Sequence, residues 1–168
     1  MTLDADRYRE AMARLGASVN IVTTGGADGD HGFTASAVCS VTDAPATLLV
    51  CMNRGGRSLA SFIGNGTLAV NVLTGGHTDL SRLFADGAVS MADRFAAAQW
   101  QRGETGAPLL CGASVAFDCR IAEWKDIGTH RVMFCAVQDV TFGADPEALI
   151  YFQRRYHRLA NALEPEAE

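Results

Sequence analysis

The chain has 168 residues, of which 48% are hydrophobic and 20% are charged, and its net charge is −5. This length suits one domain with a sizeable core, which we expect to span residues 1–168. The negative charge argues against nucleic-acid binding. The lack of a long apolar run and of a signal-peptide pattern argues against a membrane or exported protein. We therefore expect a cytoplasmic protein that binds neither nucleic acid nor membrane.

The first predicted element is an amphipathic helix over residues 4–15. Its apolar residues recur at the spacing that places them on one helical face. The residues on that face are Tyr8, Ala11, Met12 and Leu15. A face of this kind normally packs against a core.

Antiparallel strands are predicted next. The β-branched run 18–24 and the Gly-rich turn 25–30 predict a hairpin with a strand over residues 32–41. A Pro-containing turn at 42–45 leads into the apolar run 47–52, for which a strand buried on both faces is expected.

Two short helices, over residues 58–63 and 78–85, flank a predicted strand at 67–73. Residues 86–108 have no clear periodicity and suggest a loop with a turn or two of helix. Such a segment is either a functional lid or a plain surface excursion.

The C-terminal third is rich in strands. Alternating apolar and polar residues predict a half-buried strand over 113–124. A turn at 125–128 leads to a strand over 129–142, and a last short strand follows at 149–152. Tight turns between neighbouring strands imply antiparallel pairing, and closure of the sheet removes exposed edges. We predict a mainly β (α+β) Greek-key barrel with an N-terminal helix and short inserted helices.

The five cysteines include no C-x-x-C pair, and four of them lie in apolar, strand-like runs. We expect buried free thiols, with neither a catalytic thiol nor a metal site. The cysteines are Cys39, Cys51, Cys111, Cys119 and Cys135.

Common catalytic motifs do not occur. There is no G-x-S-x-G elbow, no H-E-x-x-H pair and no G-x-G-x-x-G loop. Catalysis would therefore depend on a bound organic cofactor. The segment Gly32–Asn53 suits one, because its first half is unusually small and rich in hydroxyls and lets a backbone approach a ligand closely. Tight packing of two strands is the alternative.

Several segments resemble the short-chain flavin reductase family, the small component of two-component flavin monooxygenases. Within it, the FMN reductases of pyrimidine ring-opening systems are most similar. The matching segments are Ala17–Thr24, Gly32–Asn53, Val70–Leu73, Arg94-Phe95, Ala116–Cys119, Gly128–His130, Tyr151-Phe152 and Tyr156-His157.

The resemblance implies an FMN-binding split β-barrel and a homodimer with flavin sites near the subunit interface. It also implies an oxidoreductase in which NADH, or alternatively NADPH, reduces FMN, or alternatively FAD. The reduced flavin is then released to a partner monooxygenase. A non-catalytic flavin-binding or storage barrel is the alternative, and the turn Gly128–His130 is the feature that storage does not need. An amine oxidase is disfavoured because no basic phosphate cluster is present.

Residue by residue, the resemblance places flavin contacts on Thr34, Ala35, Ser36, Ala37, Ser40, Val41, Thr42, Asn53, Arg54 and Ser58. It places the nicotinamide near Phe33, Arg94, Phe95, His130 and Tyr156, with His130 as the catalytic residue. From the residues alone, a solvent-facing turn residue is the alternative reading of His130. Tyr156 is equally readable as a dimer contact or part of a solvated tail.

Overall fold

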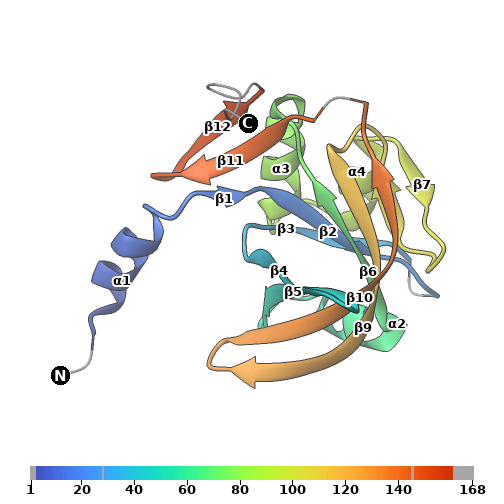
Figure 1. Cartoon of the computed structure of the whole chain (residues 1–168), viewed down its shortest axis with the longest axis horizontal. Helices are drawn as coiled ribbons and strands as arrows, with labels where there is room; N and C mark the ends of the chain where they lie inside the picture. The colour runs from blue at the N-terminus through green and yellow to red at the C-terminus, as the bar shows by residue number, and fades with distance from the viewer. Residues whose placement is uncertain (1–2, 28, 145, 161–168) are drawn as a thin grey trace.

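Antiparallel strands make up most of the molecule, as predicted (Figure 1). The computed structural model describes residues 3–27, 29–144 and 146–160. One sheet has seven strands in the order β3-β2-β6-β9-β10-β5-β4. Its strands are β2 (Asn20–Thr24), β3 (His31–Ala35), β4 (Val38–Asp43), β5 (Ala46–Asn53), β6 (Thr67–Val72), β9 (Val115–Ile127) and β10 (His130–Phe142).

Two smaller sheets and short helices complete the described part of the chain. The strand β1 (Ala17–Ser18) pairs with β11 (Ala148–Phe152), which pairs with β12 (Arg155–Leu159). The strands β7 (Trp100–Arg102) and β8 (Pro108–Leu110) form a separate pair. The helices are α1 (Ala5–Met12), α2 (Leu59–Asn65), α3 (Thr78–Ala85) and α4 (Met91–Ala96), with a 3-10 turn at Gly75–His77. Among them, none has both the length and the apolar character needed to span a membrane.

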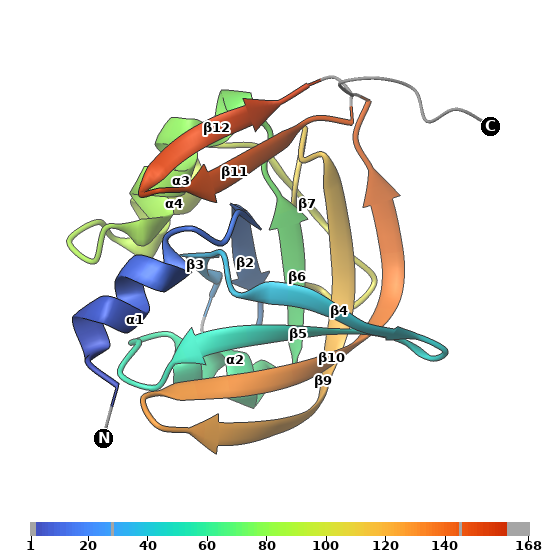
Figure 2. The ribbon, with the colours of Figure 1, turned by 60° about the vertical axis from the view of Figure 1, so that its left-hand side comes forward.

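The long strands β9 and β10 connect the two halves of the seven-stranded sheet (Figure 2). The first half of β9 pairs with β6, whereas the first half of β10 pairs with β5. Their mutual register shifts between Phe134 and Cys135 and again between Val137 and Asp139. Irregularities of this kind bend strands and increase their twist, which lets one sheet face two directions.

The edge strands β3 and β4 follow one another in the chain but lie at opposite edges of the sheet. Only Ser36 and Ala37 separate them, so the single strand predicted over residues 32–41 is wrong. The Val38 amide donates to the Ser36 carbonyl oxygen at 3.0 Å, which turns the chain locally. We call this interruption between β3 and β4, at Ser36 and Ala37, the break. It lies within the run of small residues that the sequence analysis identifies.

The strand β5 buries one face rather than two. Leu48, Val50 and Met52 are buried in the main core, whereas Leu49 and Cys51 on the opposite face remain partly exposed. The expectation of burial on both faces is therefore wrong, because no other element within the described residues fully covers that outer face. An apolar sequence pattern indicates that a strand face is shielded from water, but it does not indicate whether the same chain, a ligand or a partner shields it.

The helix α1 forms where predicted, and Asp4 caps it by accepting a hydrogen bond from the Arg7 amide at 3.0 Å. None of its residues is buried, and it stands beside the body of the molecule (Figure 1). It is tied to the β11–β12 turn, since Arg154 donates to Glu10 at 2.8 Å and the Gln153 amide donates to the Ala13 carbonyl oxygen at 2.6 Å.

Two segments are more regular than their sequences suggest. Residues 86–108 contain α4 and β7, and the basic residues 155–159 form the exposed strand β12. Both strands are short and lack an alternating apolar pattern, so periodicity does not find them. The strand β9 also runs on to Ile127, into the predicted turn at 125–128.

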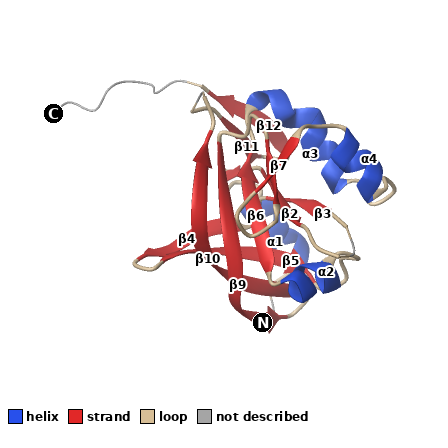
Figure 3. Cartoon of the chain, turned by 90° about the vertical axis from the view of Figure 1, so that its right-hand side faces the viewer, coloured by secondary structure: helices blue, strands red, loops and turns tan. Residues whose placement is uncertain are grey.

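A buried arginine fastens α3 and α4 to β3; Figure 3 shows the two helices together beside the sheet. Arg94 is only 4% exposed and donates to the carbonyl oxygens of Gly32 (3.2 Å), Phe84 (3.0 Å) and Asp86. Gly32 must be small, because a Cβ there would lie 2.8 Å from the Phe84 ring.

We expect Arg94→Met to lower the free energy of unfolding by about 2–4 kcal/mol, because it leaves three carbonyl groups without their charged donor. Urea denaturation measures this change. Arg9→Met is the matched control: Arg9 pairs with Asp6 on the exposed face of α1, so a change within about 0.5 kcal/mol is expected. A loss below about 1 kcal/mol in Arg94→Met would contradict the assignment.

Candidate functional site

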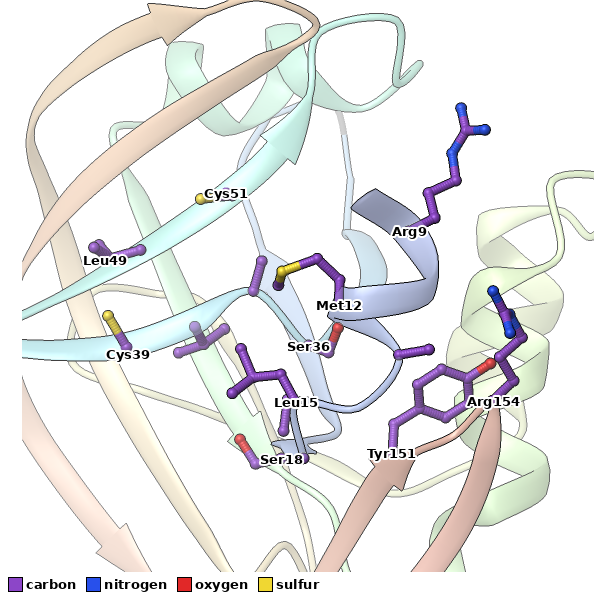
Figure 4. Close-up of a pocket in the computed structure, with 15 residues that line it drawn as sticks. Arg9, Met12, Leu15, Ser18, Ser36, Cys39, Leu49, Cys51, Tyr151 and Arg154 are labelled. Carbon is purple, nitrogen blue, oxygen red and sulfur yellow. The ribbon is translucent and has the colours of Figure 1, made fainter. Parts of the chain in front are cut away.

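A cavity of about 760 Å³ lies between α1, the outer face of β4–β5 and the β11–β12 hairpin (Figure 4). Met12 and Leu15 line one side and Leu49 and Cys51 line another, so much of its wall is apolar. Tyr151 and Arg154 add polar groups from β11–β12 (Figure 4). The cavity therefore offers apolar surface with polar groups at its margin, as sites for flat organic molecules do.

The break between β3 and β4 forms part of the cavity wall. Ser36 and Ala37, both predicted as flavin contacts, are exposed and line it. The Ala37 carbonyl oxygen accepts a hydrogen bond from the Cys51 amide at 3.0 Å, which fixes the break against β5. Small side chains there leave the cavity open.

A second cavity, of about 410 Å³, adjoins the first. It contains Ser40 and Thr42, two more predicted flavin contacts, and shares Ser18, Val38 and Cys39 with the larger cavity. Val41 is exposed on β4. Because β4 is an edge strand, its outward backbone groups have no partner strand in the sheet and can bond to a ligand.

Asn53, Arg54 and His130 come together although the sequence separates them widely. His130, the first residue of β10, lies opposite Asn53 of β5. The Arg54 amide donates to the Thr129 carbonyl oxygen at 2.9 Å. His130 is exposed, and its Nδ1 atom lies 2.9 Å from the Thr129 hydroxyl.

Thr34 and Tyr156 are linked through a residue that the sequence does not single out. The Thr34 hydroxyl donates to the Ser81 carbonyl oxygen at 2.6 Å, and the Ser81 hydroxyl lies 3.1 Å from the Tyr156 hydroxyl. Ser81 is fully buried on α3. The Arg82 guanidinium lies 5.5 Å from the centre of the Tyr156 ring and is paired with Asp79 at 3.0 Å.

Other predicted residues lie within the structure rather than in the cavity. Ala35 is buried, and Phe33 packs edge-on against Phe62. Phe95 packs against Phe84 and Trp100, with ring centres 5.3 and 4.9 Å away. Arg94 is occupied by its three carbonyl oxygens.

Ser58 stands at the N-terminal end of α2 but its hydroxyl makes no capping bond. It is buried, and its Oγ atom lies 3.3 Å from His31 Nδ1. His31 is a further neighbour that the sequence does not single out.

His130 and Tyr156 lie at opposite ends of the chain's fold, although both are predicted near the nicotinamide. His130 is at the free end of the β9–β10 hairpin, and Tyr156 lies on β12 over α3 (Figures 1 and 2). One copy of the chain therefore does not bring these two side chains together.

The cysteines are free thiols, but only Cys119 and Cys135 are buried, which corrects part of the expectation. Burial raises the pKa of Cys135 to about 12. Burial, and to a smaller extent the neighbouring Cys39, raises the pKa of Cys51 in the cavity wall. Both groups are therefore protonated thiols at neutral pH and poor nucleophiles.

A third cavity, of about 580 Å³, lies beside α3 and α4 and contains His77, Ala97 and Cys111. Burial lowers the pKa of His77, whose Nδ1 atom accepts a hydrogen bond from the Thr74 amide at 3.2 Å. No predicted site residue lines this cavity. It is a natural control for the first one.

Some residues of the cavity wall lie in segments that the sequence analysis identified, but for a structural element and not for a site. Met12 and Leu15 belong to the apolar face of the predicted helix, and Arg154 belongs to the basic C-terminal run. Tyr151 lies in the last predicted strand. Nothing in the sequence indicates that these segments converge on Ser36 and Ala37.

A family profile described as the flavin reductase like domain matches residues 12–160. The chain is 54% identical over 158 residues to a protein of Enterobacter sp. (strain 638) named FMN reductase (NADH) RutF, covering 94% of this chain and 96% of the relative. A protein of the same name from Ancylobacter novellus is 53% identical over 162 residues, covering 96% and 89%.

Solved structures agree with this match. A crystal structure from Haemophilus somnus, assigned to a flavin reductase, has a TM-score of 0.91 at 44% identity and covers 94% of this chain and 100% of that one. A Streptomyces globisporus NADH:FAD oxidoreductase, solved with NAD and FAD fragments, has a TM-score of 0.88 at 28% identity, covering 98% and 99%. BorF, the flavin reductase component of a bacterial two-component tryptophan halogenase, has a TM-score of 0.87 at 27% identity, covering 95% and 100%.

Proposed function

Because the chain belongs to the flavin reductase-like family, we propose that it is an NADH-dependent reductase of free FMN. The observation that carries the proposal is identity of more than half the residues, over nearly the whole chain, to relatives named FMN reductase (NADH). FAD is the alternative flavin, since a structural relative at 28% identity holds FAD fragments. NADPH remains the alternative donor.

We propose that the flavin lies against the break between β3 and β4. The small residues Ser36 and Ala37, the unpaired edge of β4 and the apolar wall around Leu49 fit a flat ring with hydrogen-bonding edges. Few cations face the cavity, and Arg154 is paired with Glu10. A cavity wall of this kind binds a flavin weakly, and weak binding suits a flavin that must dissociate after reduction.

When bound, the flavin accepts a hydride from the nicotinamide at its N5 atom. The chain contributes position and electrostatics. His130 lies beside Asn53 and Arg54, where an imidazole N–H would donate to negative charge on a bound, reduced flavin. Phe33, Arg94 and Phe95 have a structural role in this proposal, since their side chains pack or bond within the fold.

The wider setting follows from the same proposal. We infer one domain over residues 1–168 with a split-barrel fold, and the short connection between the edge strands β3 and β4 supports this inference. The reduced flavin diffuses to a separate monooxygenase in the cytoplasm; BorF, a relative, is a component of a two-component system. A second copy of the chain covers the cavity and supplies the side of the site that one copy leaves open.

Activity is the direct test. Mixing the protein with FMN and NADH is expected to consume NADH faster than FMN alone does, as followed by nicotinamide absorbance. We expect His130→Ala to lower kcat/KM for NADH about 10- to 100-fold with unchanged thermal stability. His77→Gln, in the third cavity, serves as the control and is expected to keep its activity. No NADH consumption by the wild type would favour flavin storage instead.

A larger side chain in the first cavity tests whether the flavin binds there. Ala37→Leu is expected to raise the Kd for FMN at least about tenfold, because the added methyl groups occupy the cavity beside the break. The matched control, Ala97→Leu, places the same side chain in the third cavity. Fluorescence quenching of FMN measures both. Equal Kd values in the two variants would contradict the placement.

The exposed apolar residues of α1 and of the turn that follows it test the presence of a second copy. Tyr8, Met12 and Leu15 are 53%, 43% and 62% exposed, an apolar face that a partner copy would cover. We expect a dimer for the wild type and a monomer for Leu15→Lys, by analytical ultracentrifugation. Leu159→Lys, at a residue 56% exposed on β12, is expected to stay dimeric. A monomeric wild type would refute the proposal.

A further inference from the structure

The free end of the β9–β10 hairpin carries His130 but has little packing of its own. Residues 122–130 are all exposed. Gly128, in the turn, has a φ of 56°, a backbone conformation that glycine adopts readily. An exposed hairpin end with a glycine turn is mobile unless side chains fix it. What fixes this end therefore decides where His130 lies.

Asp126 lies at the centre of the contacts that fix it. Its carboxylate accepts two hydrogen bonds from Arg131, Nε to Oδ1 at 2.7 Å and Nη2 to Oδ2 at 2.9 Å. Arg54 Nε lies 3.3 Å from Asp126 Oδ2. The hydrogen bond from Arg131, with added attraction from Arg131 and Arg54, lowers the pKa of Asp126, so it is ionised at neutral pH.

The same network joins two strands. Arg131 belongs to β10, and its guanidinium lies 5.3 Å from the centre of the Trp124 ring of β9. Arg54 follows β5 and donates twice to the turn, from its amide to the Thr129 carbonyl oxygen at 2.9 Å and from Nη1 to the Gly128 carbonyl oxygen at 3.2 Å. Asp126 therefore orients the arginine that holds the turn beside Asn53.

We propose that Asp126 is a positioning residue that holds His130 against the Asn53–Arg54 segment for hydride transfer. The inference rests on the proposed function. Asp126 touches neither flavin nor nicotinamide in this account and acts only through the turn. It also gives Arg54 a second role: its guanidinium, directed to Asp126 and Gly128, supports the turn.

The network is placed to affect geometry more than stability. The side chains of Arg54, Asp126 and Arg131 are 50%, 33% and 18% exposed, respectively, and ion pairs that reach solvent contribute about 1 kcal/mol or less to the free energy of unfolding. The hairpin end also lies outside the buried core clusters, which contain none of its residues. Loss of the charge is therefore expected to shift the turn while the fold persists.

The test compares Asp126→Asn with a matched pair elsewhere. We expect Asp126→Asn to lower kcat/KM for NADH about five- to tenfold, since small misplacements of a catalytic group are costly. The Kd for FMN and the melting temperature should stay near those of the wild type. The control is Asp30→Asn: Asp30 accepts two hydrogen bonds from Arg102 at 2.7 and 2.8 Å, far from the turn in sequence, and its loss is expected to leave kcat/KM unchanged.

A double variant separates positioning from other effects. If Asp126 acts only through His130, Asp126→Asn costs nothing further in the His130→Ala background. Multiplying losses, or wild-type kinetics in Asp126→Asn, would overturn the inference while leaving the proposed function intact. An inactive wild type would overturn the proposed function, and the inference with it.

Discussion

The two residues Ser36 and Ala37, which form the break between β3 and β4, connect strands that occupy opposite edges of one sheet. Because only two residues span this distance, the sheet must curl until its edges approach each other. The hydrogen bond from the Cys51 amide to the Ala37 carbonyl oxygen, at 3.0 Å, holds the break against β5. The curl leaves a cavity beside the break, and the small side chains there keep it open. The fold and the candidate flavin site thus both depend on Ser36 and Ala37.

Two apolar surfaces beside this cavity remain partly exposed. The outer face of β5 and the apolar face of α1 meet across it without burying each other. His130 and Tyr156 lie at opposite ends of the fold, so one copy of the chain does not bring their side chains together. The second copy of the chain that we propose would account for both features, because it would cover the apolar surface and bring the two side chains to one site.

Periodicity predicted the elements well where one face packs within the chain. The helix at residues 78–85 has the predicted bounds, and Phe84 is buried as expected. It failed where no described element fully covers the apolar face, as for β5 and α1, since apolar residues look alike whether a core, a ligand or a partner covers them. Pairings such as Asn53 with His130, or Thr34 with Tyr156 through Ser81, depend on strand register and helix placement, which no local pattern encodes.

The central claim is that the flavin lies against the break between β3 and β4. A crystal structure of the protein with FMN tests it most directly. The account predicts electron density for the ring in contact with Ser36 and Ala37, with one edge along β4. Density in the cavity beside Cys111, or on any surface away from the break, would contradict it.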